Sequence, residues 1–297
     1  MFSSDDTLIA LLERFAPGAQ LDALVRLTGG VSAEVFRLDF NAVSGSRQSV
    51  VLRVHGDRHA GHTAELEYQL LSALYENGLP VAEPLAIDAS GKVMPQPYLI
   101  MTFVEGTTII SPAETEKRIA TMAALLVDIH AAKKSNLPEL PLRLDPLPEV
   151  LDFLPEGDEW QALRDCLEHI PATAYTEEPK LLHGDYWPEN ILWQGDRIAA
   201  VLDWEDAAIG DPLSDVAAAG LELRYKFGVQ AMHEFTRAYA AHQPLDPRRL
   251  ALWRIYVAAA AQRYMGAWGL EPEYEAHMRR EALACIREAG EEISVSG

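Results

Sequence analysis

The sequence predicts an α+β protein with two lobes, a small β-rich lobe followed by a larger, mainly helical lobe. Runs rich in β-branched and aromatic residues dominate the first third of the chain, and helical spacing of apolar residues dominates the rest. The stretch "EGTTIISP" separates the two patterns, and no internal repeat is evident. We therefore expect an N-terminal lobe over residues 1–104 and a C-terminal lobe over residues 105–297.

The first lobe combines strands with one central helix. The opening segment "MFSSDDTLIALLERF" fits an amphipathic helix and lacks the basic n-region of a signal peptide. In "HTAELEYQLLSALYENG" the leucines follow helical spacing, and Gly78 suits the C-cap. Strands are predicted in "ALVRLTGGVSAEVFRLDF", broken at Gly29-Gly30, in "QSVVLRVH", and in a further hairpin of "AEPLAIDASGK" and "PQPYLIMTFV".

The second lobe is predicted to be mostly helical. A helix begins at Ser111-Pro112, and the proline-rich "SNLPELPLRLDPLPEV" reads as a loop. Residues 181–203 read as loop, strand, turn and strand. Four further helices are predicted in "DPLSDVAAAGLELRY", "VQAMHEFTRAYAAH", "DPRRLALWRIYVAAAAQRYMGAW" and "EPEYEAHMRREALACIREAG".

The amino-acid composition indicates which kinds of binding partner and environment the protein is expected to have. Apolar residues make up 48% of the chain, as in globular proteins, and the formal charge of −20 argues against a nucleic-acid partner. No apolar run reaches the roughly 18 residues of a membrane span. The two cysteines, Cys166 and Cys285, lack metal-ligand spacing, so we expect a reduced, cytoplasmic protein.

The stretch "LLHGDYWPENILW" concentrates polar groups beside an apolar run. Asp185 and Asn190 lie five residues apart, and the turn "QGDR" then leads to a second strand that ends near Asp203. A hairpin places Asn190 and Asp203 at the same open end. Carboxylate and amide oxygens suit Mg²⁺, and a nearby carboxylate can accept a proton from a hydroxyl group, so the pattern fits phosphoryl transfer.

The loop reads H-G-D-x-x-x-x-N and is followed by Asp203-Trp204-Glu205, the order of the catalytic loop and metal-binding triplet of kinases. With "LLHGDYWPENIL" and "AAVLDWEDAAIGDPLSDVA", the chain resembles the aminoglycoside phosphotransferase and choline kinase family, over roughly residues 24–225. The resemblance implies a two-lobed, protein-kinase-like fold. It also implies transfer of the γ-phosphate of ATP, with Mg²⁺, to a hydroxyl group of a small molecule.

The resemblance implies roles for five residues of the second lobe. Asp185 would orient the acceptor hydroxyl group and accept its proton, while Asn190 and Asp203 would bind Mg²⁺. His183 would support the loop through hydrogen bonds. Asp215, in "GDPLSDVA", would tie a helix to the catalytic loop.

The nucleotide would be bound mainly by the first lobe. Arg53, in "VVLRV", stands where protein kinases have a lysine, and its guanidinium group can contact two phosphate oxygens at once. Glu67 is its expected partner, and Glu65 is the alternative. The other implied nucleotide contacts are Gly29, Gly30 and Ser32 of "GGVSAE", and Thr102 and Val104 of the hinge "MTFVEG".

Two rival functions stay open at this point: a nucleotide-binding module with little catalysis, and a metal-dependent hydrolase using His183, Asp185 and Asp203. The single histidine counts against the hydrolase. Acceptors in the family that the chain resembles include aminoglycosides, macrolides, choline, homoserine and sugars. The acidic stretches "LPEGDEW" and "EPEYE" could meet a cationic acceptor. The acceptor, the choice between ATP and GTP, and the oligomeric state are not determined by the sequence.

Overall fold

The structure, a computed structural model, describes residues 5–27, 33–56, 61–170 and 173–295. The chain forms two compact units that interleave along the sequence. Unit 1 comprises Met1–Thr107, Ser135–Glu139 and Ile191–Asp206, and unit 2 comprises Thr108–Lys134, Leu140–Asn190 and Ala207–Gly297. The predicted α+β class is confirmed. The segment Ile191–Asp206, which the sequence boundary placed in the second lobe, belongs to unit 1.

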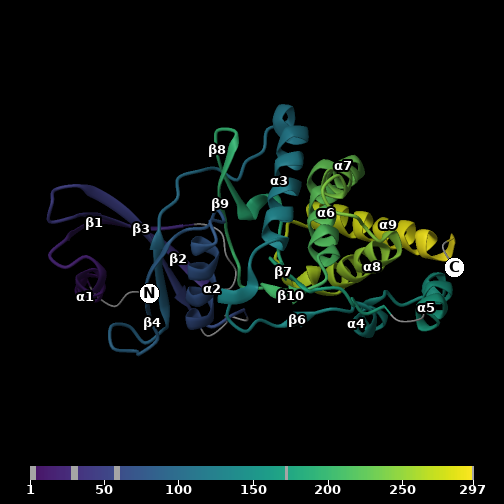
Figure 1. The fold of residues 1–297 in the computed structure, drawn as a ribbon, viewed down its shortest axis with the longest axis horizontal. Helices are drawn as coiled ribbons and strands as arrows, with labels where there is room; N and C mark the ends of the chain where they lie inside the picture. Colours follow the sequence, from purple (N-terminus) through teal and green to yellow (C-terminus); the bar gives the residue numbers. More distant parts are fainter. Residues whose placement is uncertain (1–4, 28–32, 57–60, 171–172, 296–297) are drawn as a thin grey trace. The chain divides into compact units, whose positions relative to one another are not determined.

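Unit 1 is built on a five-stranded antiparallel sheet with the strand order β1-β2-β3-β5-β4 (Figure 1). Helix α1 (Asp5–Phe15) packs against one face of this sheet, where apolar residues of α1 and of the central strands form one core. The strands are β1 (Gln20–Arg26), β2 (Ala33–Asn41), β3 (Arg47–His55), β4 (Pro84–Asp88) and β5 (Tyr98–Thr102).

Strand β3 shows why Arg53 is turned away from this core. Val50, Leu52 and Val54 are buried in the core shared with α1. Successive side chains of a strand point to opposite faces, so Arg53 and His55 lie on the other face of the sheet. Both side chains there approach helix α2.

Helix α2 (Ala64–Glu76) begins and ends as its sequence predicts. The Thr63 hydroxyl oxygen accepts the backbone N–H of Leu66 at 3.3 Å, which satisfies one free donor of the first turn. At the other end, Gly78 has φ = 79°, a conformation that favours glycine, and it follows the C-cap residue Asn77. These caps fix the position of Glu67 on the first turn of α2.

A two-stranded hairpin, β8 (Ile191–Gln194) and β9 (Arg197–Val201), completes unit 1. Trp193 and Thr107 exchange backbone hydrogen bonds of 2.8 and 3.0 Å, and the N–H of Val201 donates to the carbonyl oxygen of Pro80 at 2.7 Å. Asp203 follows the last paired residue, Val201, by two positions. The sequence predicted this strand–turn–strand pattern correctly.

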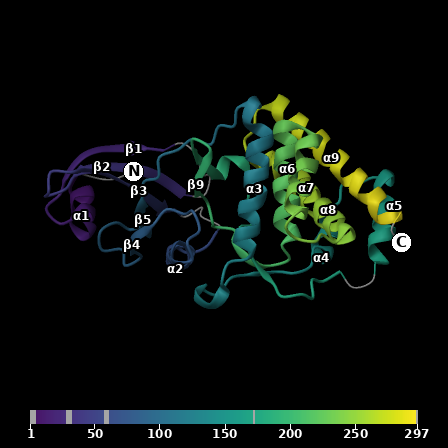
Figure 2. The same ribbon diagram turned by 45° about the horizontal axis from the view of Figure 1, so that its top comes forward.

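Unit 2 is mainly helical (Figure 2). It contains one small three-stranded sheet with the order β6-β10-β7, whose strands are labelled in Figure 1. Its strands are β6 (Leu142–Arg143), β7 (Lys180–Leu182) and β10 (Ala208–Gly210). Its α-helices are α3 (Thr115–His130), α4 (Leu147–Phe153), α5 (Gln161–Glu168), α6 (Leu213–Phe227), α7 (Val229–Ala240), α8 (Pro247–Tyr264) and α9 (Pro272–Val295). The short 3-10 helices are η1 (Pro112–Glu114), η2 (Lys134–Asn136), η3 (Asp158–Trp160), η4 (Pro188–Asn190) and η5 (Met265–Ala267), of which η2 continues into a segment of unit 1.

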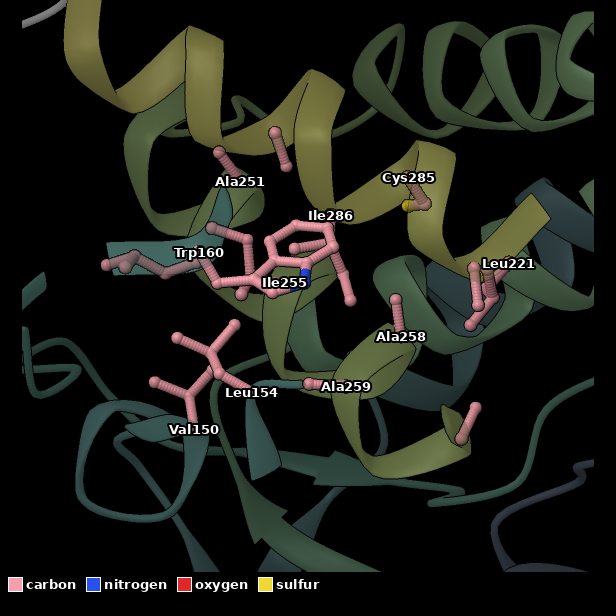
Figure 3. Packing of buried hydrophobic residues seen from close by; sticks show 14 of the residues in the cluster. Val150, Leu154, Trp160, Leu221, Ala251, Ile255, Ala258, Ala259, Cys285 and Ile286 are labelled. Atoms are coloured by element: carbon pink, nitrogen blue, oxygen red, sulfur yellow. The ribbon is translucent and has the colours of Figure 1, made fainter. Parts of the chain in front are cut away.

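The core of unit 2 forms where α8 and α9 pack together (Figure 3). Trp160 is buried among aliphatic side chains that include Leu154, which directly follows α4, Ile255 of α8 and Ile286 of α9. The buried Arg224 of α6 reaches α9 through ion pairs of 2.8 Å to Glu281 and 2.6 Å to Glu288. Burial of this apolar cluster supplies most of the cohesion between the helices.

Most predicted helices of unit 2 are confirmed, including the four that follow residue 210. The prediction that "SNLPELPLRLDPLPEV" is entirely a loop is wrong, because it contains β6 and the start of α4. Proline is tolerated in the first turn of a helix, and Pro148 occupies such a position in α4. Among the described residues, no helix is long and apolar enough to cross a membrane.

Candidate functional site

The H-G-D loop of unit 2 starts where strand β7 ends. His183 is fully buried, and its backbone N–H donates to Asp215 Oδ2 at 2.7 Å. The N–H of Gly184 donates to Asp215 Oδ1 at 3.0 Å, and φ of Gly184 is 86°, which explains the glycine at this turn. One carboxylate on α6 therefore holds two consecutive amides of the loop.

Asp215 is itself held in place by α3 and α7. Nε2 of His130 lies 3.2 Å from Asp215 Oδ2, and Nδ1 of the same ring lies 2.8 Å from the hydroxyl of Tyr239. Burial raises the pKa of Asp215, but the hydrogen bonds and charges of His130 and His183 outweigh it, and the net pKa is lowered. Asp215 is thus a buried, ionised anchor of the loop, which is the contact that the sequence analysis expected of it.

Hydrogen bonds within the loop hold Asp185 in place. The Asp185 N–H donates to Nδ1 of His183 at 3.2 Å, and Nδ2 of Asn190 donates to Asp185 Oδ2 at 3.0 Å and to its carbonyl oxygen at 2.9 Å. The buried hydroxyl of Tyr186 donates to the carbonyl oxygen of Met122 on α3 at 2.9 Å. The structure thus brings Asp185, Asn190, His183 and Asp215 together.

These contacts bear on which atoms could bind a metal ion. Nδ1 of His183 accepts the Asp185 N–H, so this nitrogen is engaged within the loop. The amide nitrogen of Asn190 points to Asp185, so its oxygen points away from that carboxylate. An amide oxygen of this kind is a hard ligand that fits Mg²⁺. Among the described residues, no group of three or more His, Cys, Asp or Glu side chains is arranged to bind a metal ion.

In unit 1, Arg53 lies among three acidic side chains. Its Nη2 is 3.2 Å from Asp203 Oδ1 and 2.5 Å from Glu205 Oε2, and its Nε is 3.3 Å from Glu67 Oε1. The expected pair of Arg53 with Glu67 is therefore present, and Glu65 is exposed. Burial lowers the pKa of Arg53, but the three carboxylates outweigh this effect and raise it.

Asp203 combines an unusual backbone with partial exposure. Its φ of 59° is the only positive value of a non-glycine residue in the described part of the chain. The side chain is 24% exposed, so solvent reaches the carboxylate even though Arg53 contacts it. Such a carboxylate fits the oxygen-rich environment that Mg²⁺ prefers.

Sequence reasoning missed two residues beside Arg53. His55 Nε2 lies 2.9 Å from Glu67 Oε2, so Glu67 contacts both Arg53 and His55. The two-residue period of strand β3 could have indicated His55, which shares its face with Arg53. Glu205 stands two residues after Asp203 and could have been recognised as a second acid of the same turn.

The remaining nucleotide contacts, in the glycine-bearing hairpin and the hinge, stay predictions. Gly29, Gly30 and Ser32 lie outside the described residues. The backbone N–H of Thr102 donates to Glu83 O at 2.9 Å, and its hydroxyl oxygen accepts the N–H of Glu83 at 2.9 Å. Both groups of Thr102 are thus paired with Glu83, and its contact with a nucleotide stays a prediction. Val104 lies two residues beyond the end of β5.

A group on α6 near Asp185 was also missed. Burial, together with the charges of Asp185 and Glu189, raises the pKa of Glu222 to about 8. The hydroxyl of Tyr225, one turn further along α6, is buried and has no hydrogen-bond partner within the described residues. The sequence read "LELRY" only as part of a helix, and the seven-residue spacing from Asp215 to Glu222 was the available signal.

The chain is similar to characterised proteins, some over most of their length and others over a small part of it. It is 26% identical over 279 residues to a homoserine kinase of Methylocella silvestris, covering 88% of this chain and 84% of that protein. It is 22% identical over 238 residues to acyl-CoA dehydrogenase family member 10 of Mus musculus, covering 67% of this chain. The match spans only 22% of that mouse protein, so it concerns one part of a much longer chain.

Solved structures share the fold over nearly the whole chain. A crystal structure from Ralstonia eutropha, assigned as an aminoglycoside phosphotransferase, has a TM-score of 0.72 at 18% identity and covers 98% of both chains. The aminoglycoside phosphotransferase APH(4)-Ia, in complex with AMP-PNP and hygromycin B, has a TM-score of 0.63 at 19% identity, covering 94% of this chain and 97% of that one. Choline kinase LicA from Streptococcus pneumoniae has a TM-score of 0.64 at 18% identity, covering 96% of this chain and 100% of that one.

These likenesses confirm the predicted kinase-like fold. The profile of the Phosphotransferase enzyme family matches residues 23–253, which is more than half of the chain and includes both the H-G-D loop and the Asp203 turn. The chain belongs to the Phosphotransferase enzyme family.

Proposed function

We propose that the protein transfers the γ-phosphate of ATP to a hydroxyl group of a small molecule in a reaction that requires Mg²⁺. The main support for this proposal is the hydrogen bond from Asn190 to Asp185. It holds the partly exposed carboxylate of Asp185 next to the amide group of Asn190, whose oxygen is a suitable metal ligand. Family membership and the AMP-PNP bound to the structurally similar APH(4)-Ia support the nucleotide assignment. We further propose that the enzyme acts in the cytoplasm.

Asp185 would act on the acceptor. Its carboxylate would accept a hydrogen bond from the acceptor hydroxyl group and align that oxygen with the γ-phosphorus atom. As the new oxygen–phosphorus bond forms and the bond to the bridging oxygen of ADP breaks, the hydroxyl proton passes to Asp185. Asn190 would keep the carboxylate from rotating, since its Nδ2 binds both Oδ2 and the carbonyl oxygen of Asp185.

The charged nucleotide requires cationic partners. The guanidinium group of Arg53 would bind α- and β-phosphate oxygens, and Glu67 would hold it in place through the ion pair of 3.3 Å. Asn190 of unit 2 and Asp203 of unit 1 would be the ligands of Mg²⁺. When bound, Mg²⁺ would neutralise negative charge on the transferred phosphoryl group.

The two rival functions are less well supported. The hydrolase would need His183 as a metal ligand, but this residue is fully buried and its Nδ1 is engaged by the loop. A nucleotide-binding module without catalysis would not need a carboxylate held at Asp185. An assay can separate this module from the enzyme.

The test is an ATP-consumption assay against a panel of hydroxylated and amine-bearing small molecules, with and without Mg²⁺, and with GTP for comparison. We expect acceptor-dependent formation of ADP and a phosphate ester detectable by phosphorus NMR. Asp185→Asn should lower phosphotransfer by roughly 10² or more, as expected for loss of a general base, and leave Mg-ATP affinity unchanged. Asp165→Asn, an exposed position on α5, is the matched control. Tight ATP binding without turnover of any acceptor would instead support the binding module.

A further inference from the structure

Strand β3 carries a second polar side chain on the face that bears Arg53. His55 follows Arg53 by two residues, so the two side chains point to the same face of the sheet. The backbone N–H of His55 donates to the carbonyl oxygen of Pro97 at 2.9 Å, which joins the end of β3 to the residue before β5. The backbone at His55 is therefore held in the sheet, as that of Arg53 is.

Glu67 of α2 lies between these two side chains. Its Oε1 is 3.3 Å from Arg53 Nε, and its Oε2 is 2.9 Å from His55 Nε2. An ionised carboxylate only accepts hydrogen bonds, so His55 Nε2 is the donor of the second contact. The three side chains are between 4% and 8% exposed. Because each oxygen has its own partner, the carboxylate cannot rotate without breaking one of these contacts.

Arg53 is also attracted by two acidic groups in the segment that follows β9. Its Nη2 lies 2.5 Å from Glu205 Oε2 and 3.2 Å from Asp203 Oδ1. Glu67 holds the same guanidinium group through Nε. If the Glu67 carboxylate turned away, Asp203 and Glu205 alone would neutralise Arg53. The contact with Glu67 therefore limits how far the guanidinium group is drawn to the proposed metal ligand Asp203.

The segment after β9 is itself held against the chain that leads into α2. The backbone N–H of His62 donates to the carbonyl oxygen of Glu205 at 3.3 Å. A Cβ atom at Gly61 would lie 2.6 Å from Cβ of Glu205, so the two backbones approach as closely as a glycine allows. Since these contacts keep Glu205 beside Arg53, the balance of forces on Arg53 depends on Glu67, and thus on His55.

We propose that His55 is a positioning residue of the nucleotide site, which holds the carboxylate of Glu67 against Arg53. With Glu67 held in this way, the guanidinium group is not drawn completely onto the acidic segment after β9. This inference rests on the proposed function, because it concerns how Arg53 is presented to the phosphate groups of ATP. Loss of the His55 donor leaves a buried carboxylate oxygen of Glu67 without this partner, so nucleotide affinity falls while acceptor binding does not.

The first experiment compares two substitutions by calorimetry with AMP-PNP, with and without Mg²⁺. His55→Leu removes the donor and keeps an apolar side chain. His55→Gln keeps a donor, because the amide nitrogen of glutamine reaches about as far from the backbone as Nε2 of histidine. His55→Leu should weaken binding by about tenfold or more, as for loss of a hydrogen bond to a charged group, and His55→Gln should stay within about threefold of wild type. Equal affinities in wild type and His55→Leu, or equal losses in both variants, overturn the inference.

A double substitution tests whether His55 acts through Glu67. In the Glu67→Gln background, the carboxylate that His55 holds is already absent. Adding His55→Leu there should weaken AMP-PNP binding by less than about twofold, although the same change costs about tenfold in wild type. A purely structural contribution of the ring would produce the tenfold loss in both backgrounds, and this result overturns the inference.

Val54→Ala is the matched control for stability. Val54 lies between Arg53 and His55 on β3, but its side chain is buried in the core shared with α1. Val54→Ala should lower the melting temperature and leave AMP-PNP affinity within about twofold of wild type. A loss of affinity as large as that of His55→Leu would assign the effect to the stability of unit 1 and overturn the inference. If His55→Leu does not fold, His55→Asn replaces it, because its shorter side chain does not reach Glu67.

Kinetics separate this inference from the proposed function. With an acceptor found in the panel, His55→Leu should raise KM for ATP by about tenfold and leave KM for the acceptor within about twofold of wild type. A rise in both KM values overturns the inference and leaves the proposed phosphotransferase standing. Nucleotide binding that depends on His55, without turnover of any acceptor, supports the inference and counts against the proposed function alone.

Discussion

The side-chain amide of Asn190 donates a hydrogen bond to the carboxylate of Asp185 at 3.0 Å. The sequence assigned metal binding to Asn190 and the acceptor hydroxyl group to Asp185, but the two side chains are in direct contact. The Asn190 amide nitrogen restrains Asp185, and the Asn190 amide oxygen is directed away from Asp185 and can bind a metal ion. Substitution of Asn190 should therefore affect the acceptor chemistry as well as the metal requirement.

Asn190→Asp is the sharpest test of this coupling. The new carboxylate would lie against Asp185, and repulsion between like charges raises the pKa of the pair. The pH–rate profile of phosphotransfer should shift to higher pH, and the rate at neutral pH should fall by about tenfold or more. A profile that keeps its wild-type midpoint would show that Asp185 and Asn190 act independently.

Lysine at position 53 is predicted to replace the function of Arg53 only in part. It contacts Glu67, Asp203 and Glu205, whereas a lysine acts as a single point charge. Arg53→Lys should weaken Mg-ATP binding by about tenfold in calorimetry and lower the melting temperature. Arg53→Ala should destabilise unit 1 by roughly 3–5 kcal/mol, the cost of leaving buried acidic groups without their partner.

Arg47→Lys is the control for this change, because Arg47 lies on the same strand with an exposed side chain. It should leave both nucleotide affinity and melting temperature unchanged. Equal nucleotide affinity in wild type, Arg53→Lys and Arg53→Ala would remove Arg53 from the nucleotide site.

At Asp203 the backbone and the carboxylate can be tested separately. Asparagine tolerates a φ of 59°, whereas alanine there costs roughly 1–2 kcal/mol. Asp203→Asn and Asp203→Ala should both lose Mg²⁺-dependent turnover, but Asp203→Ala should melt at the lower temperature. Full Mg²⁺-dependent activity in a folded Asp203→Ala protein would exclude Asp203 as a metal ligand.

Glu222 should make stability depend on pH. Its folded-state pKa of about 8 lies above the ordinary value of 4.5, so folding favours the protonated form. The stabilising effect is complete below pH 4.5 and is lost as the pH rises toward 8, by about 1.4 kcal/mol per pH unit at most. The glutamine of Glu222→Gln cannot ionise. The free energy of unfolding of this variant, measured by denaturant titration, should therefore rise relative to that of wild type as the pH increases from 4.5 to 8. A constant difference between pH 5 and 8 would contradict the raised pKa.

Gly210 is predicted to be irreplaceable for a packing reason. A Cβ atom at this position would lie 1.9 Å from the carbonyl oxygen of Arg143, on the neighbouring strand. Gly210→Ala should therefore separate β6 from β10 and destabilise unit 2 by about 1–3 kcal/mol. Gly266→Ala has space for the added atom and should stay within about 0.5 kcal/mol of wild type in the same measurement.

The sequence predicted those parts of the site that lie close together along the chain. Asp185 and Asn190 belong to one loop, and the strand pattern after it led directly to Asp203. His55 and Glu222 escaped because their significance depends on contacts between distant segments: β3 with α2, and α6 with the catalytic loop. The spacing of residues along the sequence predicts which face of a helix or strand a residue occupies. It does not identify the helix, strand or loop that packs against that face.

The errors in the fold have a similar cause. Helix α4 was missed because its proline-rich sequence resembles a loop, yet Val150 and Leu154 bury against α8 in the core of unit 2. Tertiary burial stabilised a short helix that local propensity does not favour. The hairpin β8–β9 was predicted correctly, but its membership of unit 1 depends on backbone bonds to Thr107 and Pro80, which lie far away in the sequence.

Helix α6 carries at its start Asp215, whose carboxylate binds two consecutive amides of the catalytic loop. The anchor acts on backbone amides from the buried side, so the loop can keep its shape while side chains further along the helix change. Evolution can therefore exchange one alcohol acceptor for another without changing Asp215 and the loop that it binds. In a laboratory selection for a new acceptor, we therefore expect Asp215 and His130 to remain constant.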